Sequence, residues 1–330
     1  MPIATPLFCG DRTLRRRETS GICRYRPRTG ILLAMADDSD MAERTHRSLL
    51  QRLLFVDSLA PASLPAPRPQ EQIVITALMR RQPEVSSRWF RRCIEKELCN
   101  RLHERRHELN LASVKIYRDA SARGLLSLFL QFTRSHGYTA FLCRVLRRPA
   151  PSPYRIPYGV LYDNVVQLVF ADEPTSGRLE EVRTLLHSPD LACAECTVLV
   201  SDRQYVVYDN KTPGDEKRRV NICFLVNRPR NMSRDTCQSY WRTRHADLAL
   251  RNMNYLRLTR YLQVHSAGSP PHGYDDSYDG VVYAEKSSRA RLLLELGKPD
   301  SFRFNNTVVI DETNFTECTP IMLLSLASGF

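Results

Sequence analysis

The chain has 330 residues, 42% of them hydrophobic, and a formal net charge of +12. This length is enough for two domains, each with its own core. No apolar run reaches the ~20 residues that a membrane span needs, so we expect a cytoplasmic protein without a membrane partner. Residues 1–34 hold seven arginines against two acidic residues, and the remainder lacks a basic stripe interleaved with aromatic residues. A nucleic-acid partner is therefore not expected.

Residues 1–70 precede the first predicted domain. Their composition changes abruptly at Met35, and we expect the ordered protein to begin near that residue. A short helix is predicted over 41–56, with its leucines on one side. The proline-rich stretch 60–69 cannot continue that helix and is predicted to be a semi-extended linker.

The first predicted domain covers 71–209. Hydrophobic periodicity predicts, in order, a strand at 73–79, a helix at 85–109, strands at 114–118 and 165–170, a helix at 178–186 and a strand at 197–200. Residues 119–160 form an insertion of a length that is usually functional or specific to a family. The polar segment 210–219, which contains Pro-Gly, is predicted to link this domain to the next.

The second predicted domain covers 220–330. The pattern predicts a strand at 221–226, a helix at 233–251 with Ser233 as its N-cap, strands at 257–265 and 281–285, a helix at 289–296 and a strand at 307–310. Both domains thus show the order of a βαββαβ, ferredoxin-like unit.

An ungapped alignment supports an internal repeat. LHSPDLACAECTVLVSD (186–202) placed under LGKPDSFRFNNTVVIDE (296–312) matches Pro189 with Pro299 and Thr197 with Thr307, and YDNVV (162–166) matches YDGVV (278–282). A sheet of this unit has helices on one face only, so its other face needs a cover. We predict an α+β fold in which the two repeats pack sheet on sheet as an intramolecular α+β barrel, with a cleft between each sheet and its own helices.

Ten cysteines are scattered without a disulfide-framework pattern and are expected to be reduced thiols. The CxxC formed by Cys193 and Cys196 lacks a second pair at zinc-finger spacing. The chain also lacks a phosphate loop, a dinucleotide fingerprint and a nucleophile elbow. We expect no metal and no cofactor.

Two histidines of the second half have spacings that could place them together. Trp241, His245 and Leu248 share one helical stripe, while Tyr261, Gln263 and His265 alternate along one face of a strand. If that face meets the helix, both histidines reach one cleft, with Asp279 and Tyr283 on the adjacent strand. Histidine titrates near neutral pH, so such a pair suits acid/base chemistry without a cofactor. The alternative is that His245 is a core histidine with its hydrogen bonds satisfied and that His265 lies at an exposed strand end.

The strings YWRTRHADL (240–248), YLQVH (261–265) and YDGVV (278–282) resemble the EthD family of the dimeric α+β barrel superfamily. The resemblance covers residues 220–325, and the first half looks like a diverged copy. Many fungal members act in aromatic polyketide pathways as cofactor-free decarboxylases, dehydratases or cyclases. Members usually pair two chains, so a tandem repeat would make that pair internal; a further homodimer stays open.

The resemblance implies a lyase or cyclase of secondary metabolism acting on an aromatic or polyketide-derived small molecule. The expected catalytic residues are His245, His265, Tyr261 and Asp279. The expected substrate-binding residues are Tyr240, Trp241, Gln263, Tyr283, Asn221 and Cys223. A cofactor-free oxygenase on the same fold and a non-catalytic binding or scaffold protein remain alternatives.

The first half departs from this pattern. Aligning Phe90 with Trp241 places Ile94 where His245 stands, and His103 and His107 are expected on a solvent-exposed, arginine-rich face. We therefore expect one working cleft, in the second half. The first half would be structural or would supply a lid through 119–160.

Overall fold

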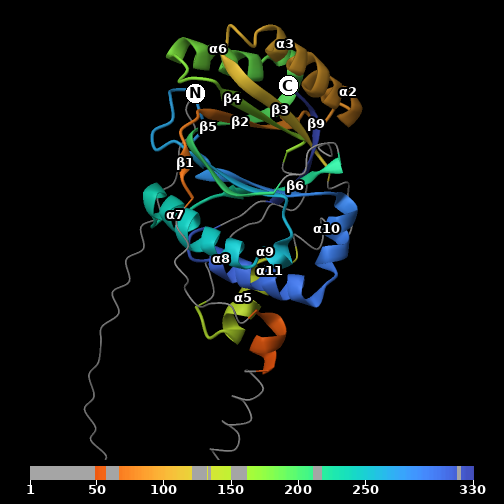
Figure 1. Ribbon diagram of the computed structural model, residues 1–330. Coiled ribbons are helices and arrows are strands. Elements are labelled where there is room, and N and C mark those ends of the chain that lie inside the picture. Colours follow the sequence, from red (N-terminus) through yellow and green to blue (C-terminus); the bar gives the residue numbers. More distant parts are fainter. Residues whose placement is uncertain are drawn as a thin grey trace, which may run out of the picture. The chain divides into compact units, whose positions relative to one another are not determined.

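The computed structural model describes residues 49–56, 67–120, 132, 135–149, 162–210, 218–317 and 321–330 (Figure 1). The first half runs through β1 (Pro69–Gln70), β2 (Val74–Arg81), α2 (Ser87–Arg92), the π-helical η1 (Cys93–Leu98), α3 (Cys99–Glu104), β3 (Leu111–Asp119), α5 (His136–Val145), β4 (Asn164–Phe170), α6 (Ser176–Leu186), the short η2 (Pro189–Leu191) and β5 (Cys193–Asp209). Every element predicted for this half is present. Strand β5 is far longer than the predicted 197–200.

The second half runs through β6 (Val220–Val226), α7 (Arg234–Tyr240), the π-helical η4 (Trp241–His245), α8 (Ala246–Arg251), α9 (Met253–Leu256), β7 (Arg260–Ser266), β8 (Gly280–Lys286), α10 (Arg289–Leu296), α11 (Pro299–Glu312) and β9 (Ile321–Gly329). Ser233 caps α7 as predicted, because its side chain accepts a hydrogen bond from the Thr236 amide. Among the described residues, no helix is long and apolar enough to cross a membrane.

The strands form one antiparallel sheet in the order β1-β5-β2-β4-β3-β9-β6-β8-β7, and pairing of β5 with β7 closes it into a barrel. The first half contributes the order β5-β2-β4-β3 and the second half the order β9-β6-β8-β7. In each half, the fourth strand along the chain therefore pairs with the first, the first with the third, and the third with the second. The predicted α+β barrel is therefore confirmed at the level of a mixed α+β fold with a closed antiparallel sheet. In Figure 1, helices α2, α3 and α6 of the first half lie on one side of the sheet region, whereas α5 lies with the second-half helices on the other side.

Alternation along the strands separates the barrel interior from the helix-covered face. On β7, Leu262 and Val264 join an interior cluster that contains first-half residues such as Leu78 and Leu199. The neighbouring Tyr261 joins the cluster that the strands form with the second-half helices. The period of two thus directs alternate side chains of β7 toward the helices, as the sequence predicts.

The predicted strand at 307–310 is wrong, because these residues lie within helix α11. Pro299 occupies the first turn of that helix and Asp300 follows it, which is a favourable helix start. The last strand is β9, further along the chain. The ungapped alignment therefore equates Thr197, in a strand, with Thr307, in a helix, and does not describe equivalent positions.

Part of the insertion covers the outside of α11. Helix α5 packs on Val309 and Ile310 of α11, and the Tyr138 hydroxyl lies 2.8 Å from Asn306 Oδ1. The helical residues 49–54 join the same cluster through Leu50 and Leu54, whereas Leu49 and Leu53 are more than half exposed. The predicted leucine side of 41–56 is thus only half buried. Residues 41–48 and the remainder of the predicted lid, 121–131, 133–134 and 150–160, lie outside the described residues.

The first helices of the two halves share one detail. In each, a serine caps the N-terminus and a π-helical stretch follows after six or seven helical residues, at Cys93–Leu98 and Trp241–His245. Counting from the caps Ser86 and Ser233 places Leu98, not Ile94, at the position of His245. Leu98 is fully buried in the first-half core. His103 and His107 are exposed, as predicted.

Candidate functional site

An apolar cavity lies between strands β6, β7 and β8 and the second-half helices. Its volume is about 1020 Å³, part of which is open solvent. Side chains such as Phe224, Leu258, Phe304 and Phe315 line it, and a few polar groups interrupt this lining. An apolar cleft with few polar groups is the usual form of a small-molecule site. The predicted cleft between the second-half sheet and its helices is thus present.

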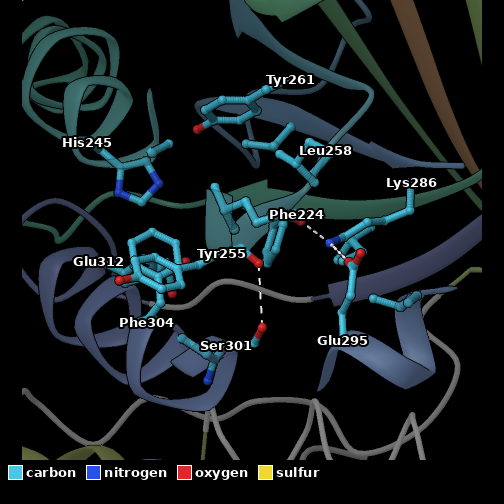
Figure 2. A pocket seen from close by; sticks show the side chains of 18 of the residues that line it. Phe224, His245, Tyr255, Leu258, Tyr261, Lys286, Glu295, Ser301, Phe304 and Glu312 are labelled. Carbon is cyan, nitrogen blue, oxygen red and sulfur yellow. Dashed lines mark hydrogen bonds and ion pairs between the residues drawn. The ribbon is translucent and has the colours of Figure 1, made fainter. Parts of the chain in front are cut away.

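His245 lies in the wall of this cavity and is 8% exposed (Figure 2). Its Nδ1 atom lies 2.8 Å from Oδ2 of Asp311, on α11. A carboxylate only accepts hydrogen bonds, so Nδ1 carries the proton and Nε2 is the basic nitrogen. The other oxygen of Asp311 accepts a 2.8 Å hydrogen bond from the Tyr240 hydroxyl. Asp311 therefore fixes both the tautomer and the orientation of the imidazole.

Tyr261 and Trp241 also line the cavity, and both are buried. The Tyr261 hydroxyl accepts a 3.2 Å hydrogen bond from Nε2 of Gln263, which also donates to the Trp241 carbonyl. Burial raises the pKa of Tyr261 to about 12, so its phenol is neutral at physiological pH. A neutral phenol can donate its proton to an oxygen on which negative charge develops. Gln263 itself supports Tyr261 and is not part of the lining.

A buried ion pair lies across the cavity from His245 (Figure 2). The Nζ atom of Lys286 donates to Glu295 Oε2 at 2.5 Å and to the Leu256 carbonyl. Burial lowers the pKa of Lys286, and Glu295 opposes this change. Two polar pairs, His245–Asp311 and Lys286–Glu295, therefore lie on opposite sides of the cavity, and the lining also contains the polar side chains of Ser301, Asn305 and Glu312.

His265 does not reach this cavity, so the prediction of two histidines in one cleft is wrong. The indole of Trp241 stands between them: its ring stacks on His265 with centroids 4.3 Å apart and planes at 2°. His265 Nε2 lies 3.1 Å from Gln263 Oε1, and because both N–H groups of that amide face acceptors, the imidazole is the donor. Burial, followed by the charges of Arg242 and Arg203, lowers the pKa of His265 to about 3. A histidine in this state cannot supply a proton near neutral pH.

Three predicted substrate-binding residues face the barrel interior instead of the cavity. Cys223 and Tyr283 belong to the interior cluster, and the Tyr283 ring lies 5.7 Å from that of Tyr117 in the first half. Asn221 lies two residues before Cys223 on β6 and shares its face. The strand period places Ile222 and Phe224, which were not predicted, in the lining. The sequence alone did not reveal which face of β6 and β8 meets the helices.

Asp279 is buried outside the cavity, at the start of β8. It accepts hydrogen bonds from the Arg228 amide at 2.7 Å and from the Arg234 guanidinium at 2.9 Å. The next residue, Gly280, lies against Trp241: a Cβ there would collide with the Val264 carbonyl and lie 2.7 Å from Trp241 Cζ3. The Asp-Gly pair of YDGVV therefore anchors the segments around Trp241 and does not line the site.

The sequence interpretation missed Asp311, Glu312, Lys286 and Glu295. The predicted strand at 307–310 places Asp311 and Glu312 after a strand, whereas both lie in helix α11. Phe304, Val308 and Asp311 follow one another at intervals of four and three, a helical stripe that begins after Pro299. Three of the missed residues, Glu312, Lys286 and Glu295, line the cavity, whereas Asp311 reaches it through His245.

The cysteine pair shows no sign of reactivity. Cys193 and Cys196 are partly buried, and burial raises the pKa of both thiols, that of Cys193 to about 12. Over the described ranges, no three histidine, cysteine or acidic side chains are grouped so that they could hold a metal ion.

No protein-family model matches this chain, and no curated protein matches it. Several solved structures resemble it in fold. An anthrone oxidase-like protein is 7% identical with a TM-score of 0.38, over 79% of this chain and 93% of its own. A variant of chlorite dismutase from Candidatus Nitrospira defluvii is 12% identical with a TM-score of 0.40, over 78% and 91%. The chemistry of the site must therefore be argued from its own geometry.

Proposed function

We propose that the second half is an enzyme that transfers a proton on an apolar, aromatic or polyketide-derived small molecule without a cofactor. The observation that carries this proposal is the hydrogen bond between Asp311 and Nδ1 of His245, which leaves Nε2 as the base in the wall of an apolar cavity. A carboxylate that orients a histidine in this way is the usual arrangement of a general base. The reaction class that fits best is that of a lyase or cyclase.

In the proposed mechanism, Nε2 of His245 removes a proton from a phenol or an activated C–H group of the substrate. The electron pair moves onto a carbonyl oxygen, which Tyr261 stabilises by donating a hydrogen bond. Expulsion of a β-hydroxyl group, which leaves as water with the proton of the imidazolium, or attack on a second carbonyl, whose oxygen takes that proton, consumes the resulting enolate. In a decarboxylation the enolate forms instead when carbon dioxide leaves, and a protonated His245 supplies the proton to its carbon. The imidazolium of His245, stabilised by Asp311, returns the proton to the product. His265, the acid expected from the sequence, has no part in this cycle.

The proposal includes a finer assignment of the fold. The strings at 240–248, 261–265 and 278–282 and the common strand order of the two halves support a tandem, EthD-like repeat. In the first half, Leu98 replaces the histidine and the space under the helix is filled by core residues such as Phe90 and Ile94. We place the working site in the second half alone.

The test compares metabolites by mass spectrometry in a host that uses this protein in its native pathway. One strain makes the wild type, one the His245→Ala variant and one the His272→Ala variant, a matched control because His272 is exposed on a loop. A precursor heavier by carbon dioxide or water in the His245→Ala strain alone would identify a lyase. An isomeric precursor would identify a cyclase.

Two results would favour other functions. A product that contains oxygen from labelled O₂, with the same dependence on His245, would identify a cofactor-free oxygenase. An unchanged profile with a folded His245→Ala variant would contradict proton transfer and favour a binding protein. Circular dichroism of each purified variant provides the folding control.

A further inference from the structure

A second, polar pocket lies beside His265, the residue that stacks on Trp241 of the apolar cavity. Its volume is about 520 Å³, including open solvent. Strand β5 of the first half contributes Arg203 and Tyr205, and the second half contributes Asp235, Gln238, Ser239, Arg242 and His265. The pocket therefore crosses the seam where β5 pairs with β7, and Arg203 lies directly opposite His265 in that pairing.

Two guanidinium groups of this pocket have spare hydrogen-bonding capacity. Arg242 donates through Nη1 to the Tyr205 hydroxyl at 3.1 Å, while its Nε is shielded from solvent and has no partner in the described part of the chain. The Arg203 side chain is 58% exposed, and its nearest carboxylate, Asp202, is 3.9 Å away. An arginine with unused donors is suited to bind an oxyanion.

The other polar groups limit the charge that the pocket can accept. Asp235 opposes the two arginines, which leaves one excess positive charge among the lining residues. His265 adds no charge, because burial and the two neighbouring guanidinium groups hold its pKa far below neutrality. Tyr205, Gln238 and Ser239 are uncharged. The balance favours a group that carries a single negative charge.

We propose that this pocket is a binding site for a small oxyanion, held between Arg203 and Arg242 beside His265. The ligand class is a carboxylate or a phosphate group of a small molecule, with the singly charged carboxylate preferred because of Asp235. The site is independent of the function proposed for the apolar cavity. His265 lines this pocket and stacks on Trp241, which lines the apolar cavity, so the two sites are linked through this ring pair.

Isothermal titration of the full chain with sodium acetate and with inorganic phosphate, in a buffer without other oxyanions, tests the site. We expect saturable binding, and a roughly ten- to hundredfold weaker affinity for Arg242→Gln and for Arg203→Gln. Arg203→Gln is the safer variant for folding, because its side chain is largely exposed. Arg244→Gln is the matched control, since Arg244 lies on the same helix, is exposed and does not line the pocket. Asp235→Asn should bind more tightly than the wild type.

A second measurement reports from within the pocket. Bound phosphate, which stays anionic in the acidic range where His265 titrates, should raise the pKa of His265 by roughly 1 to 3, which an NMR titration of the imidazole would detect. Tighter binding of acetate would identify a carboxylate ligand, and tighter binding of phosphate a phosphorylated one. Absence of saturable binding, or equal affinities of the wild type, Arg242→Gln and Arg203→Gln, would overturn the proposal. So would an unchanged pKa of His265 at saturating phosphate.

Discussion

The carboxylate of Asp311 lies 2.8 Å from Nδ1 of His245, although the two residues are 66 positions apart on different helices. This contact leads to the first prediction. Asp311→Asn keeps the size of the side chain but presents an amide, which no longer favours the Nδ1-protonated imidazole or stabilises the imidazolium. We expect product formation to fall by about 10²- to 10⁴-fold, the usual contribution of general acid–base catalysis. Rates measured with the native metabolite extract, by mass spectrometry, check this.

Asp300→Asn is the control for that experiment, because Asp300 lies on the same helix with a side chain that is 62% exposed. Its rate should equal that of the wild type. Tyr240→Phe removes the other hydrogen bond to Asp311 and should cause a smaller loss than Asp311→Asn. Equal rates for wild type and Asp311→Asn would mean that Asp311 has only a structural role.

The second prediction concerns the buried ion pair of the cavity. Glu295→Ala leaves the Lys286 ammonium without its carboxylate, in surroundings where both side chains are only 6% and 4% exposed. We expect the free energy of unfolding to fall by about 3–5 kcal/mol. The double variant Lys286→Met, Glu295→Leu should recover most of this loss, because apolar groups of similar volume need no charge partner. Urea unfolding at pH 7 provides both values.

A matched comparison is the exposed pair of Arg303 and Asp300, whose loss in Asp300→Asn should cost no more than about 1 kcal/mol. If Glu295→Ala is as mild as that control, Lys286 must lose its proton when its partner is removed. A double variant that is no more stable than Glu295→Ala would contradict the prediction.

The third prediction is an acid sensitivity due to His265. Its pKa is about 3 in the folded protein, against 6.5 for an ordinary histidine. Between these values the unfolded chain binds a proton that the folded chain does not. The folded state therefore loses about 1.4 kcal/mol of stability for each pH unit below 6.5, and regains it as the pH rises. Urea unfolding at pH 7, 6, 5 and 4, in buffers without phosphate, measures the slope.

His265→Phe retains an aromatic ring against Trp241 but cannot titrate. Its stability at pH 7 should be lower, because Gln263 Oε1 loses its donor, and its slope between pH 6.5 and 4 should be flatter than that of the wild type. Carboxylates elsewhere affect both proteins equally, so the difference between the slopes isolates His265. Parallel slopes would show that His265 is accessible to protons in the folded state.

The fourth prediction concerns the glycine against which Trp241 packs. Gly280→Ala places a methyl group in contact with the Val264 carbonyl and with the indole, so the strand or the ring must move. Overpacking of this kind typically costs about 1–3 kcal/mol. Gly268→Ala is the control, because a Cβ at that position meets nothing within 4 Å. The midpoints of thermal unfolding should fall for Gly280→Ala and stay near the wild type for Gly268→Ala.

Local patterns in the sequence predicted strands β2 to β8, but not β1 or β9, and the first helix of each half, because alternation and helical spacing reflect burial directly. They failed at 307–310, where Thr-Val-Val-Ile resembles a strand but the Pro299 start and the packing of α5 favour a helix. β-branched residues are only weakly unfavourable in helices, so tertiary contacts can override them. Because 307–310 was predicted to be a strand, Asp311 was not recognised as a helical neighbour of the site.

The candidate site was predicted in part, because spacing along a helix or strand shows which side chains share a face. The spacing of Trp241 and His245 predicted that the histidine faces the sheet, and the alternation of Tyr261, Gln263 and His265 predicted that the three share one face, without deciding whether that face meets the helices. The sequence did not reveal that the Trp241 indole separates the two histidines, since this depends on a stacking contact between a helix and a strand. Nor could it reveal whether Tyr283 faces inward, because β8 is buried on both faces.

The single long strand β5 pairs with strands of both halves. Its first part, Cys193–Ser201, hydrogen-bonds to β2 in its own half, and its last part, Ser201–Asp209, hydrogen-bonds to β7 in the other half. A fragment that ends within the predicted linker 210–219 would lose the pairing with β7 and would keep only the two-residue β1 against this part of β5, so most of that edge would be exposed as a template for aggregation. Both halves therefore depend on β5 for strand pairing, and expression of either half alone would leave the barrel open.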